Sequence, residues 1–264
     1  MIDFHNHILP NQDDGSNSLE VSLSMLKHAA DQGITDVVNT VHFQHPKVDF
    51  LKINNSKISS AINNLQEELN KRKIPITLHF GAEVFYLPNL LDIIDNPLVT
   101  FGKRKYILIE FSVYDIPRTQ KQVLYDLKIK GITPIIAHPE RYKQVQENIY
   151  LVYDWLNSGC LIQVDAGSII GTLGKKSKIA AEKIINNNWC QILGSDAHDN
   201  HRRNFCLREG YELVQEMIGV KYAEPLVNKN PRLVIEGKSI YVDIDPIEKE
   251  SDKFWQKLVK RLSH

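Results

Sequence analysis

Two histidines, His5 and His7, stand one residue apart in the opening stretch "MIDFHNHILPNQDD". The letters "MIDF" before them are typical of a short buried strand, and side chains two apart in a strand project to the same side. The two imidazoles therefore leave the strand end together, as two ligands of one metal ion would. The alternative is a pair of ordinary polar residues at a strand-loop junction.

The same chemistry recurs where later apolar runs end. A carboxylate inside a run such as "YILIEFS" is costly to bury unless it is paired or bound to a metal. Six predicted strand ends carry such groups, and parallel strands of a barrel build their site at these ends. The sequence therefore predicts a metal centre made of His5, His7, Asp14, His42, Glu83, Glu110, His138, Asp196 and His198.

Nine ligands, four of them carboxylates and five neutral imidazoles, are too many for one ion and suit two or three. Three divalent ions would bring six positive charges against four negative ones. Such a site attracts a phosphate dianion and lowers the pKa of bound water toward ~7, which supplies hydroxide at neutral pH. This favours phosphoester hydrolysis. Nitrogen and oxygen donors without thiolate suit manganese, iron or zinc.

Three arginines lie close to the predicted ligands. Arg141 follows His138 in "AHPERY", and Arg202 and Arg203 follow "SDAHDNH". Guanidinium groups bind phosphate oxygens and stabilise transition-state charge, so these three are candidate catalytic residues. His45 and His201 lie in loops beside the ligands and are candidate substrate contacts. Arginines and histidines in loops are also commonly just solvated.

The elements that position these residues alternate along the chain. Apolar, β-branched runs, typical of parallel strands buried on both faces, are separated by amphipathic helical patterns. Seven such units predict an α/β fold, a distorted (βα)7 TIM-like barrel, with an open doubly wound sheet as the alternative. The predicted strands span 1–5, 36–42, 76–85, 106–112, 133–138, 161–166 and 190–198, and the helices 18–33, 58–73, 119–131, 148–159 and 176–188.

No repeat, low-complexity tract or linker splits the first 220 residues, so 1–264 is predicted to be a single domain with 221–264 as a C-terminal extension. Residues 239–246 alternate polar and apolar, and 247–264 form an amphipathic pattern that gathers Phe254, Leu258, Val259 and Leu262. This segment is expected to cap the barrel or to contact a second copy in a homo-oligomer.

Bulk properties exclude several classes of protein. Lys plus Arg and Asp plus Glu both number 32, so no net charge favours a nucleic acid or an anionic membrane. No apolar run approaches the ~18 residues of a membrane span, and no leader pattern is present, so a cytoplasmic location is expected. Three widely spaced cysteines indicate no disulfide framework, and none has the Arg six positions later that a cysteine phosphatase needs.

The motifs "HNH", "DDG", "TVH", "GAE", "IEF", "AHPERY" and "SDAH" resemble, in order, those of the polymerase-and-histidinol-phosphatase (PHP) superfamily over roughly residues 1–235. Within it, "GAEVFYLPNLL" and "GITPIIAHPERY" look most like the manganese-dependent protein-tyrosine phosphatases of bacterial capsule and exopolysaccharide clusters. The resemblance implies a distorted seven-stranded βα barrel and hydrolysis of the phosphorylated tyrosine-rich tail of a polysaccharide co-polymerase kinase.

The resemblance also implies how the metals are shared. One ion is held by His5, His7, Glu83 and Asp196, a second by Glu83, Glu110 and His138, and a third by Asp14, His42 and His198. After His42 the chain reads "FQHPKVDF", which departs from the family pattern and leaves the peptide-facing loop open. The alternatives are a small-molecule phosphatase of the histidinol-phosphate type, a polymerase-linked nuclease, and a non-catalytic metal-binding regulatory module.

Overall fold

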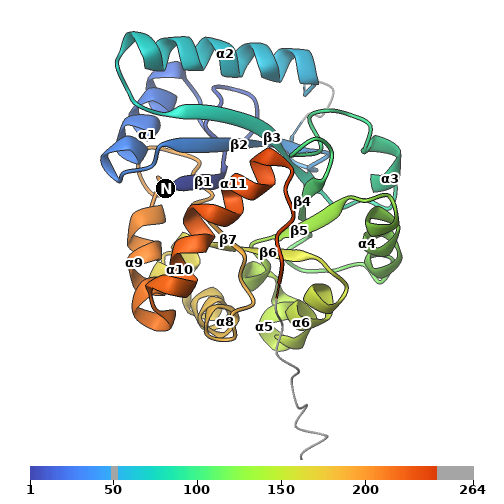
Figure 1. The fold of residues 1–264 in the computed structure, drawn as a ribbon. Coiled ribbons are helices and arrows are strands. Elements are labelled where there is room, and N and C mark those ends of the chain that lie inside the picture. Colours follow the sequence, from blue (N-terminus) through green and yellow to red (C-terminus); the bar gives the residue numbers. More distant parts are fainter. Residues whose placement is uncertain (49–52, 243–264) are drawn as a thin grey trace, which may run out of the picture.

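The protein is a barrel of seven parallel strands in sequential order, seen in a computed structural model that describes residues 1–48 and 53–242 (Figure 1). The ends of the sheet meet where Asp196 N donates to His5 O at 2.7 Å and His7 N to Ala197 O at 2.8 Å. The predicted barrel is confirmed, and an open sheet is excluded. The strands are β1 Ile2–Asn6, β2 Asp36–Phe43, β3 Thr77–Phe85, β4 Tyr106–Glu110, β5 Thr133–Ala137, β6 Leu161–Asp165 and β7 Ile192–Gly194.

Helices surround the strands (Figure 1). The five that the sequence predicts are α1 Leu19–Asp31, α2 Asn55–Lys71, α4 Gln120–Ile129, α6 Tyr150–Asn157 and α8 Lys175–Asn186. The others are α3 Leu90–Ile93, the 3-10 turn η2 Pro139–Arg141, α5 Lys143–Glu147, α7 Ala166–Ile170, α9 Leu207–Ile218, α10 Val220–Val227 and α11 Lys229–Glu236.

Helix α1 shows how local sequence sets these boundaries. The Ser18 side chain accepts a hydrogen bond from Val21 N at 3.2 Å and caps the first turn. Leu23, Leu26 and their neighbours on one face are buried in the core. Gly33, with φ +81°, then takes the left-handed conformation that follows many helices.

Strand β1 contains an irregularity that decides which side chains reach the barrel mouth. Its pairing with β2 shifts register between Asp3 and Asn6, so one extra residue stands on β1. A bulge of this kind changes which face the following side chains take. Phe4 consequently packs in the apolar interior, whereas His5, the next residue, turns toward Glu83.

The amino end of the barrel is closed by α11, which crosses it in Figure 1. Val234 of this helix belongs to the same buried hydrophobic cluster as Ile2, Phe4 and Leu108. Tyr106 donates from its hydroxyl to Lys238 O at 2.5 Å, which fixes the segment after α11. The described part of the extension, 221–242, therefore lies on the barrel. Residues 239–242 are not a strand, and the amphipathic pattern at 247–264 lies outside the described residues.

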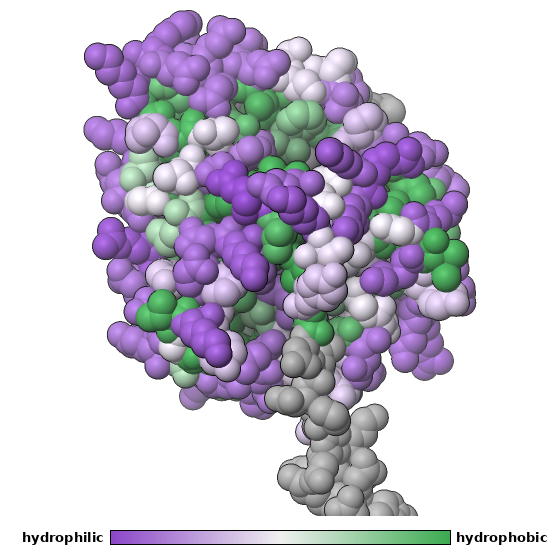
Figure 2. All heavy atoms as spheres, viewed as in Figure 1, coloured by the Kyte–Doolittle hydropathy of each residue, from purple (hydrophilic) through white to green (hydrophobic). Residues whose placement is uncertain are grey.

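The face viewed in Figure 2 is mostly hydrophilic, with hydrophobic side chains in small separate groups. Among the described helices none has the length and apolarity to cross a bilayer. The predicted metal ligands lie at the other end of the barrel, where the strands finish.

Candidate metal centre

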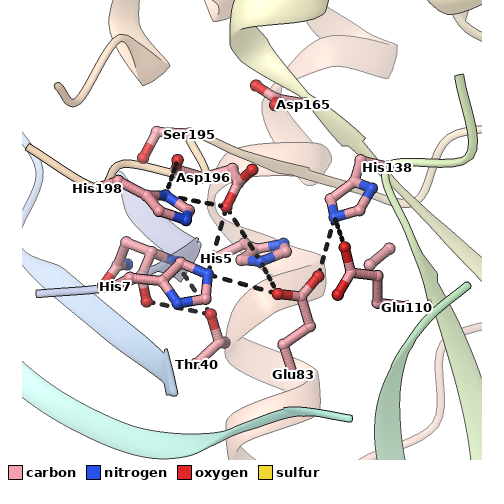
Figure 3. Close-up of polar contacts among 12 residues, drawn as sticks. His5, His7, Thr40, Glu83, Glu110, His138, Asp165, Ser195, Asp196 and His198 are labelled. Carbon is pink, nitrogen blue, oxygen red and sulfur yellow. Dashed lines mark hydrogen bonds and ion pairs between the residues drawn. The ribbon is translucent and has the colours of Figure 1, made fainter. Parts of the chain in front are cut away.

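Imidazole and carboxylate side chains from separate strands converge at the carboxyl end of the barrel, and Figure 3 shows His5, His7, Glu83, Glu110, His138, Asp196 and His198 among them. All nine predicted ligands are among them: His5 and His7 at the end of β1, Asp14 in the loop after it, His42 on β2, Glu83 on β3, Glu110 on β4, His138 after β5, and Asp196 and His198 after β7. All but Asp14 are buried, and the Asp14 side chain is 39% exposed.

Glu83 occupies the middle of this group. Its Oε2 atom lies 3.2 Å from His5 Nε2 and 3.4 Å from His7 Nε2. Its Oε1 atom lies 2.9 Å from His138 Nε2. His42 Nδ1 lies 3.1 Å from the same Oε2. One carboxylate thus faces four imidazoles, the arrangement expected of a bridging ligand.

Asp196 connects the imidazoles to two arginines. Its Oδ1 lies 3.4 Å from His5 Nε2 and 3.3 Å from His7 Nε2. Its Oδ2 accepts hydrogen bonds from Arg141 at 2.5 Å and Arg203 at 2.6 Å. The two guanidinium groups therefore stand at the edge of the histidine cluster.

A third group lies toward solvent. Asp14 Oδ1 is 3.3 Å from His42 Nε2 and 3.5 Å from His198 Nε2. Together with His7 these residues bring four potential ligand atoms within 4.8 Å of one another. Three further sets among the described residues satisfy the same criterion: His5 with His7 and Asp196, His5 with Glu83 and His138, and His42 with His45 and Glu110.

Several buried atoms in the cluster have no hydrogen-bond partner in the described structure. They are His5 Nε2, His7 Nε2, His42 Nδ1, His138 Nδ1, Glu83 Oε2 and Glu110 Oε2. Leaving such atoms unpaired costs roughly 1–3 kcal/mol each, and more for charged groups. A divalent cation would satisfy nitrogen and oxygen lone pairs together, so the residues present fit a metal centre.

Hydrogen bonds behind the cluster fix the imidazole tautomers. His7 Nδ1 lies 2.8 Å from Asp13 Oδ2, and His5 Nδ1 lies 2.9 Å from Gln163 Oε1. His198 Nδ1 lies 2.8 Å from the Asp196 carbonyl. An Nδ1–H donated backward leaves the Nε2 lone pair free to bind a metal, which is the usual arrangement around metal-bound histidines.

Sequence reasoning missed Asp13 and Gln163. Asp13 stands directly beside the predicted ligand Asp14, and Gln163 is the one polar side chain inside the run "LIQV". A buried amide in an apolar strand needs partners, and this signal could have identified it.

The charges in the cluster shift several pKa values strongly. Burial opposes charge on His5, but the carboxylates of Glu83 and Asp196 outweigh it and raise its pKa to about 9. Burial and the nearby Glu83 charge raise the pKa of Glu110 well above its usual range. Without a cation these groups compete for protons, as expected where ligands are gathered for a metal.

The backbone is strained at two of these positions. His138 has φ +30° and Asp196 has φ +49°, in the left-handed region that non-glycine residues avoid. Strain of this kind costs about 1–3 kcal/mol and collects at functional sites. Gly194 permits the close approach of β7 to β1, because a Cβ there would lie 2.8 Å from His5 Cβ.

The structure separates the other candidates. Arg202 and His201 are exposed, and within the described ranges no hydrogen bond, ion pair or ring contact joins their side chains to a site residue. His45 lies at the mouth, with its ring stacked on His42 at 4.3 Å and its Nε2 3.7 Å from Glu110 Oε2. The "FQHP" segment, which departs from the family pattern, therefore places His45 beside the predicted ligands.

Comparison with known proteins decides the family. The model of the family described as capsular polysaccharide synthesis, CpsB/CapC, matches residues 1–236. The chain belongs to the CpsB/CapC family. CapC of Staphylococcus aureus is 32% identical over 97% of this chain and 98% of its own length. The tyrosine-protein phosphatase YwqE of Bacillus subtilis is 32% identical over 91% of this chain and 94% of its own.

A solved structure from work on YwqE and on CpsB of Streptococcus pneumoniae, described as metal-dependent tyrosine phosphatases, superposes on this member of the CpsB/CapC family with a TM-score of 0.87. Identity is 30%, and the match covers 94% of this chain and all of that one. The predicted resemblance, fold and reaction class, a metal-dependent tyrosine phosphatase, are thereby confirmed.

Proposed function

We propose that this chain hydrolyses phosphotyrosine on a protein of capsular polysaccharide synthesis, with the nine converging side chains as its metal ligands. The observation that carries the proposal is the group of buried imidazole and carboxylate atoms without partners, with two arginines beside it. The relatives named as tyrosine-protein phosphatases supply the substrate class.

The proposed centre holds two or three divalent ions, manganese first, with iron and zinc compatible with the same donors. His5, His7 and Asp196 would hold one ion together with Glu83. Glu83, Glu110 and His138 would hold a second, and Asp14, His42 and His198 a third. Glu83 supports this sharing, since its two oxygens face different histidines.

When bound, the ions would lower the pKa of water and neutralise phosphate charge at the barrel mouth. Arg141 gives one donor to Asp196 Oδ2, and Arg203 donates to Asp196 Oδ2 and O, so both guanidinium groups keep further N–H donors for phosphate oxygens. Asp13 is a buried carboxylate beyond the four counted from the sequence, so it makes the site more negative. The positive charges of Arg141 and Arg203 therefore matter more for attracting a phosphate.

The leaving group also fits. A tyrosine phenol has a pKa of about 10, so it departs as an anion far more readily than an alkyl alcohol. Positive charge around the phosphoryl group then stabilises the transition state more than a proton donor to the leaving group would. Phe85 and His45, in edge-to-face contact at 5.2 Å, provide aromatic surface at the mouth.

We also propose that the substrate is a cognate polysaccharide co-polymerase kinase and that the protein is cytoplasmic and forms a homo-oligomer. Residues 1–264 are proposed to be a single domain with 221–264 as its extension. We include Arg141 and Arg203 as catalytic residues and leave out Arg202, because its side chain reaches no site residue within the described ranges.

The experiment compares a phosphotyrosine peptide, p-nitrophenyl phosphate and histidinol phosphate, with purified protein loaded with manganese or stripped by a chelator. We expect metal-dependent hydrolysis of both aryl phosphates and little of the alkyl ester. Faster hydrolysis of histidinol phosphate would favour the small-molecule phosphatase. Loss of all phosphatase activity at full metal occupancy would favour the regulatory module.

A further inference from the structure

A groove of about 460 Å³ lies on the outside of the barrel between α8 and the corner where α5 meets α6. These helices are neighbours in Figure 1. The groove is separate from the metal centre, and its walls combine two kinds of side chain. They are the lysines Lys143, Lys176 and Lys183 and the apolar or aromatic residues Ile149, Tyr150 and Ile179.

The lysines give the groove a positive charge. Among the described residues that line it, Glu147 is the one carboxylate, against three ammonium groups. Within the described residues, none of these three lysines forms an ion pair, since no carboxylate oxygen lies within 4.0 Å of their ammonium groups. The ion pairs that are present are made by other lysines and by arginines and histidines. Their charges are thus available to an acidic ligand.

The apolar side chains make the groove more than a charged surface. Ile179 is 42% exposed and Tyr150 39% exposed, although both have large apolar areas. On α8, Lys176, Ile179 and Lys183 share one helix face by their spacing of three and four. Exposed apolar groups between unpaired cations suit a polypeptide that carries acidic and apolar side chains.

One wall of the groove is joined to the turn that carries Arg141. Lys143 follows Arg141 by two residues, so their Cα atoms lie within about 8 Å. Gln146, which also lines the groove, donates to Glu140 O at 2.9 Å and ties this wall to the turn that carries Arg141. Lys176 and Lys183 are about 10 Å apart along α8, the length of three extended residues.

We propose that this groove binds an acidic segment of the substrate polypeptide a few residues from its phosphotyrosine. The inference rests on the proposed function, because it needs a protein substrate at the metal centre. It adds a second recognition site, in which Lys176 and Lys183 pair with Asp or Glu while Ile179 and Tyr150 contact the aliphatic parts of the segment.

The test uses a K176Q/K183Q variant, which removes two charges but keeps side-chain length, and a K27Q/K130Q control on exposed lysines of α1 and the end of α4. Phosphotyrosine peptides carry three acidic residues, beginning three positions before or after the tyrosine, or amides in their place. For at least one acidic peptide we expect KM to rise roughly three- to tenfold in K176Q/K183Q, with kcat unchanged. The amide peptide and p-nitrophenyl phosphate should be unaffected.

The effect should also shrink at high salt, because exposed charge pairs are screened. Equal KM values for acidic and amide peptides with the unaltered protein would overturn the groove proposal alone. So would an equal rise in KM from the K27Q/K130Q control. Failure to hydrolyse any phosphotyrosine peptide, with p-nitrophenyl phosphate still cleaved, would overturn the proposed function as well.

Discussion

The two ends of the barrel both contain buried ionisable groups, but the carboxylate at the amino end has hydrogen-bond partners for both oxygens, whereas some described carboxylates at the carboxyl end do not. At the amino end, Asp36 accepts from Arg232 at 3.0 and 2.8 Å and from Thr35 at 2.9 Å, and faces His79 at 2.9 Å. At the carboxyl end, Glu83 and Glu110 each keep a buried oxygen without a hydrogen-bond partner.

The difference separates structural charge from functional charge. The amino end places its charges beside an apolar interior and satisfies them with the protein's own groups, which fastens α11 to the barrel. The carboxyl end gathers more charge than the protein's own groups satisfy. Such an excess is costly to stability unless a bound ion offsets it.

The largest expected effect is at the centre of the cluster. Glu83→Gln keeps the shape of the side chain but removes the charge that faces four histidines. We expect kcat/KM for phosphotyrosine peptide to fall by roughly 10³-fold or more, since bridging ligands act as a unit with the rest of the site. Bound metal, measured by mass spectrometry after desalting, should fall with it.

The comparison predicts the stability of the same variant. Mn²⁺ should raise the unfolding temperature of the unaltered protein and raise that of Glu83→Gln much less, because the variant has lost a ligand. An equal rise in both proteins would show that Glu83 does not bind the ion, and would weaken the distinction between the two ends.

The arginines should give a graded series. Arg141→Ala, which removes the guanidinium closest to Asp196, should lower kcat/KM about 10²- to 10³-fold, as loss of one transition-state donor typically does. Arg203→Ala, on the same oxygen but more exposed, should cost less. Arg202→Ala is the matched control and should stay within about twofold; a loss as large as that of Arg141 would contradict the placement.

At the amino end, Arg232→Ala should reduce stability and leave catalysis alone. Loss of its two hydrogen bonds to Asp36 should lower the free energy of unfolding by about 1–2 kcal/mol, since the arginine is partly exposed. Arg208→Ala, which breaks an exposed pair with Glu212, is the control and should cost about 0.5 kcal/mol or less. Urea denaturation with parallel assays measures both; a fall in kcat from Arg232→Ala would contradict the separation of the ends.

The smallest effect is a proton balance. With the pKa of His5 raised to about 9 in the metal-free protein, its imidazole holds a proton at pH 7.5 that a metal ion must displace. Calorimetric titration with Mn²⁺ in two buffers of different ionisation enthalpy should show release of protons, and apparent affinity should rise with pH toward 9. Metal binding without proton release would contradict this charge state.

The sequence predicts the carboxyl end better than the amino end for a physical reason. Ligands such as Glu110 must be polar inside apolar strands, and that contrast is visible in the letters "ILIEF". The closure by α11 depends on Val234 and Arg232, which are ordinary helix residues, and α9 and α10 likewise pack through tertiary contacts. The bulge in β1, which lets Phe4 and His5 face inward together, leaves no mark in the sequence.

Long-range partners were equally hard to predict. Gln163 reaches His5 across 158 positions, and nothing in either segment indicates the pairing. Asp13 and Asp14 are adjacent carboxylates with different tasks, one behind His7 and the other between His42 and His198. Only the loop geometry distinguishes them.

Anomalous diffraction from manganese-loaded crystals, with data collected on both sides of the manganese absorption edge, tests this account most directly. We expect two or three peaks at the carboxyl end, each within about 2.0–2.3 Å of imidazole nitrogens or carboxylate oxygens, with Glu83 in contact with two of them. Fully occupied manganese sites at other places in the molecule, with no peak between Glu83 and the His5–His7 pair, would contradict a metal centre at the carboxyl end.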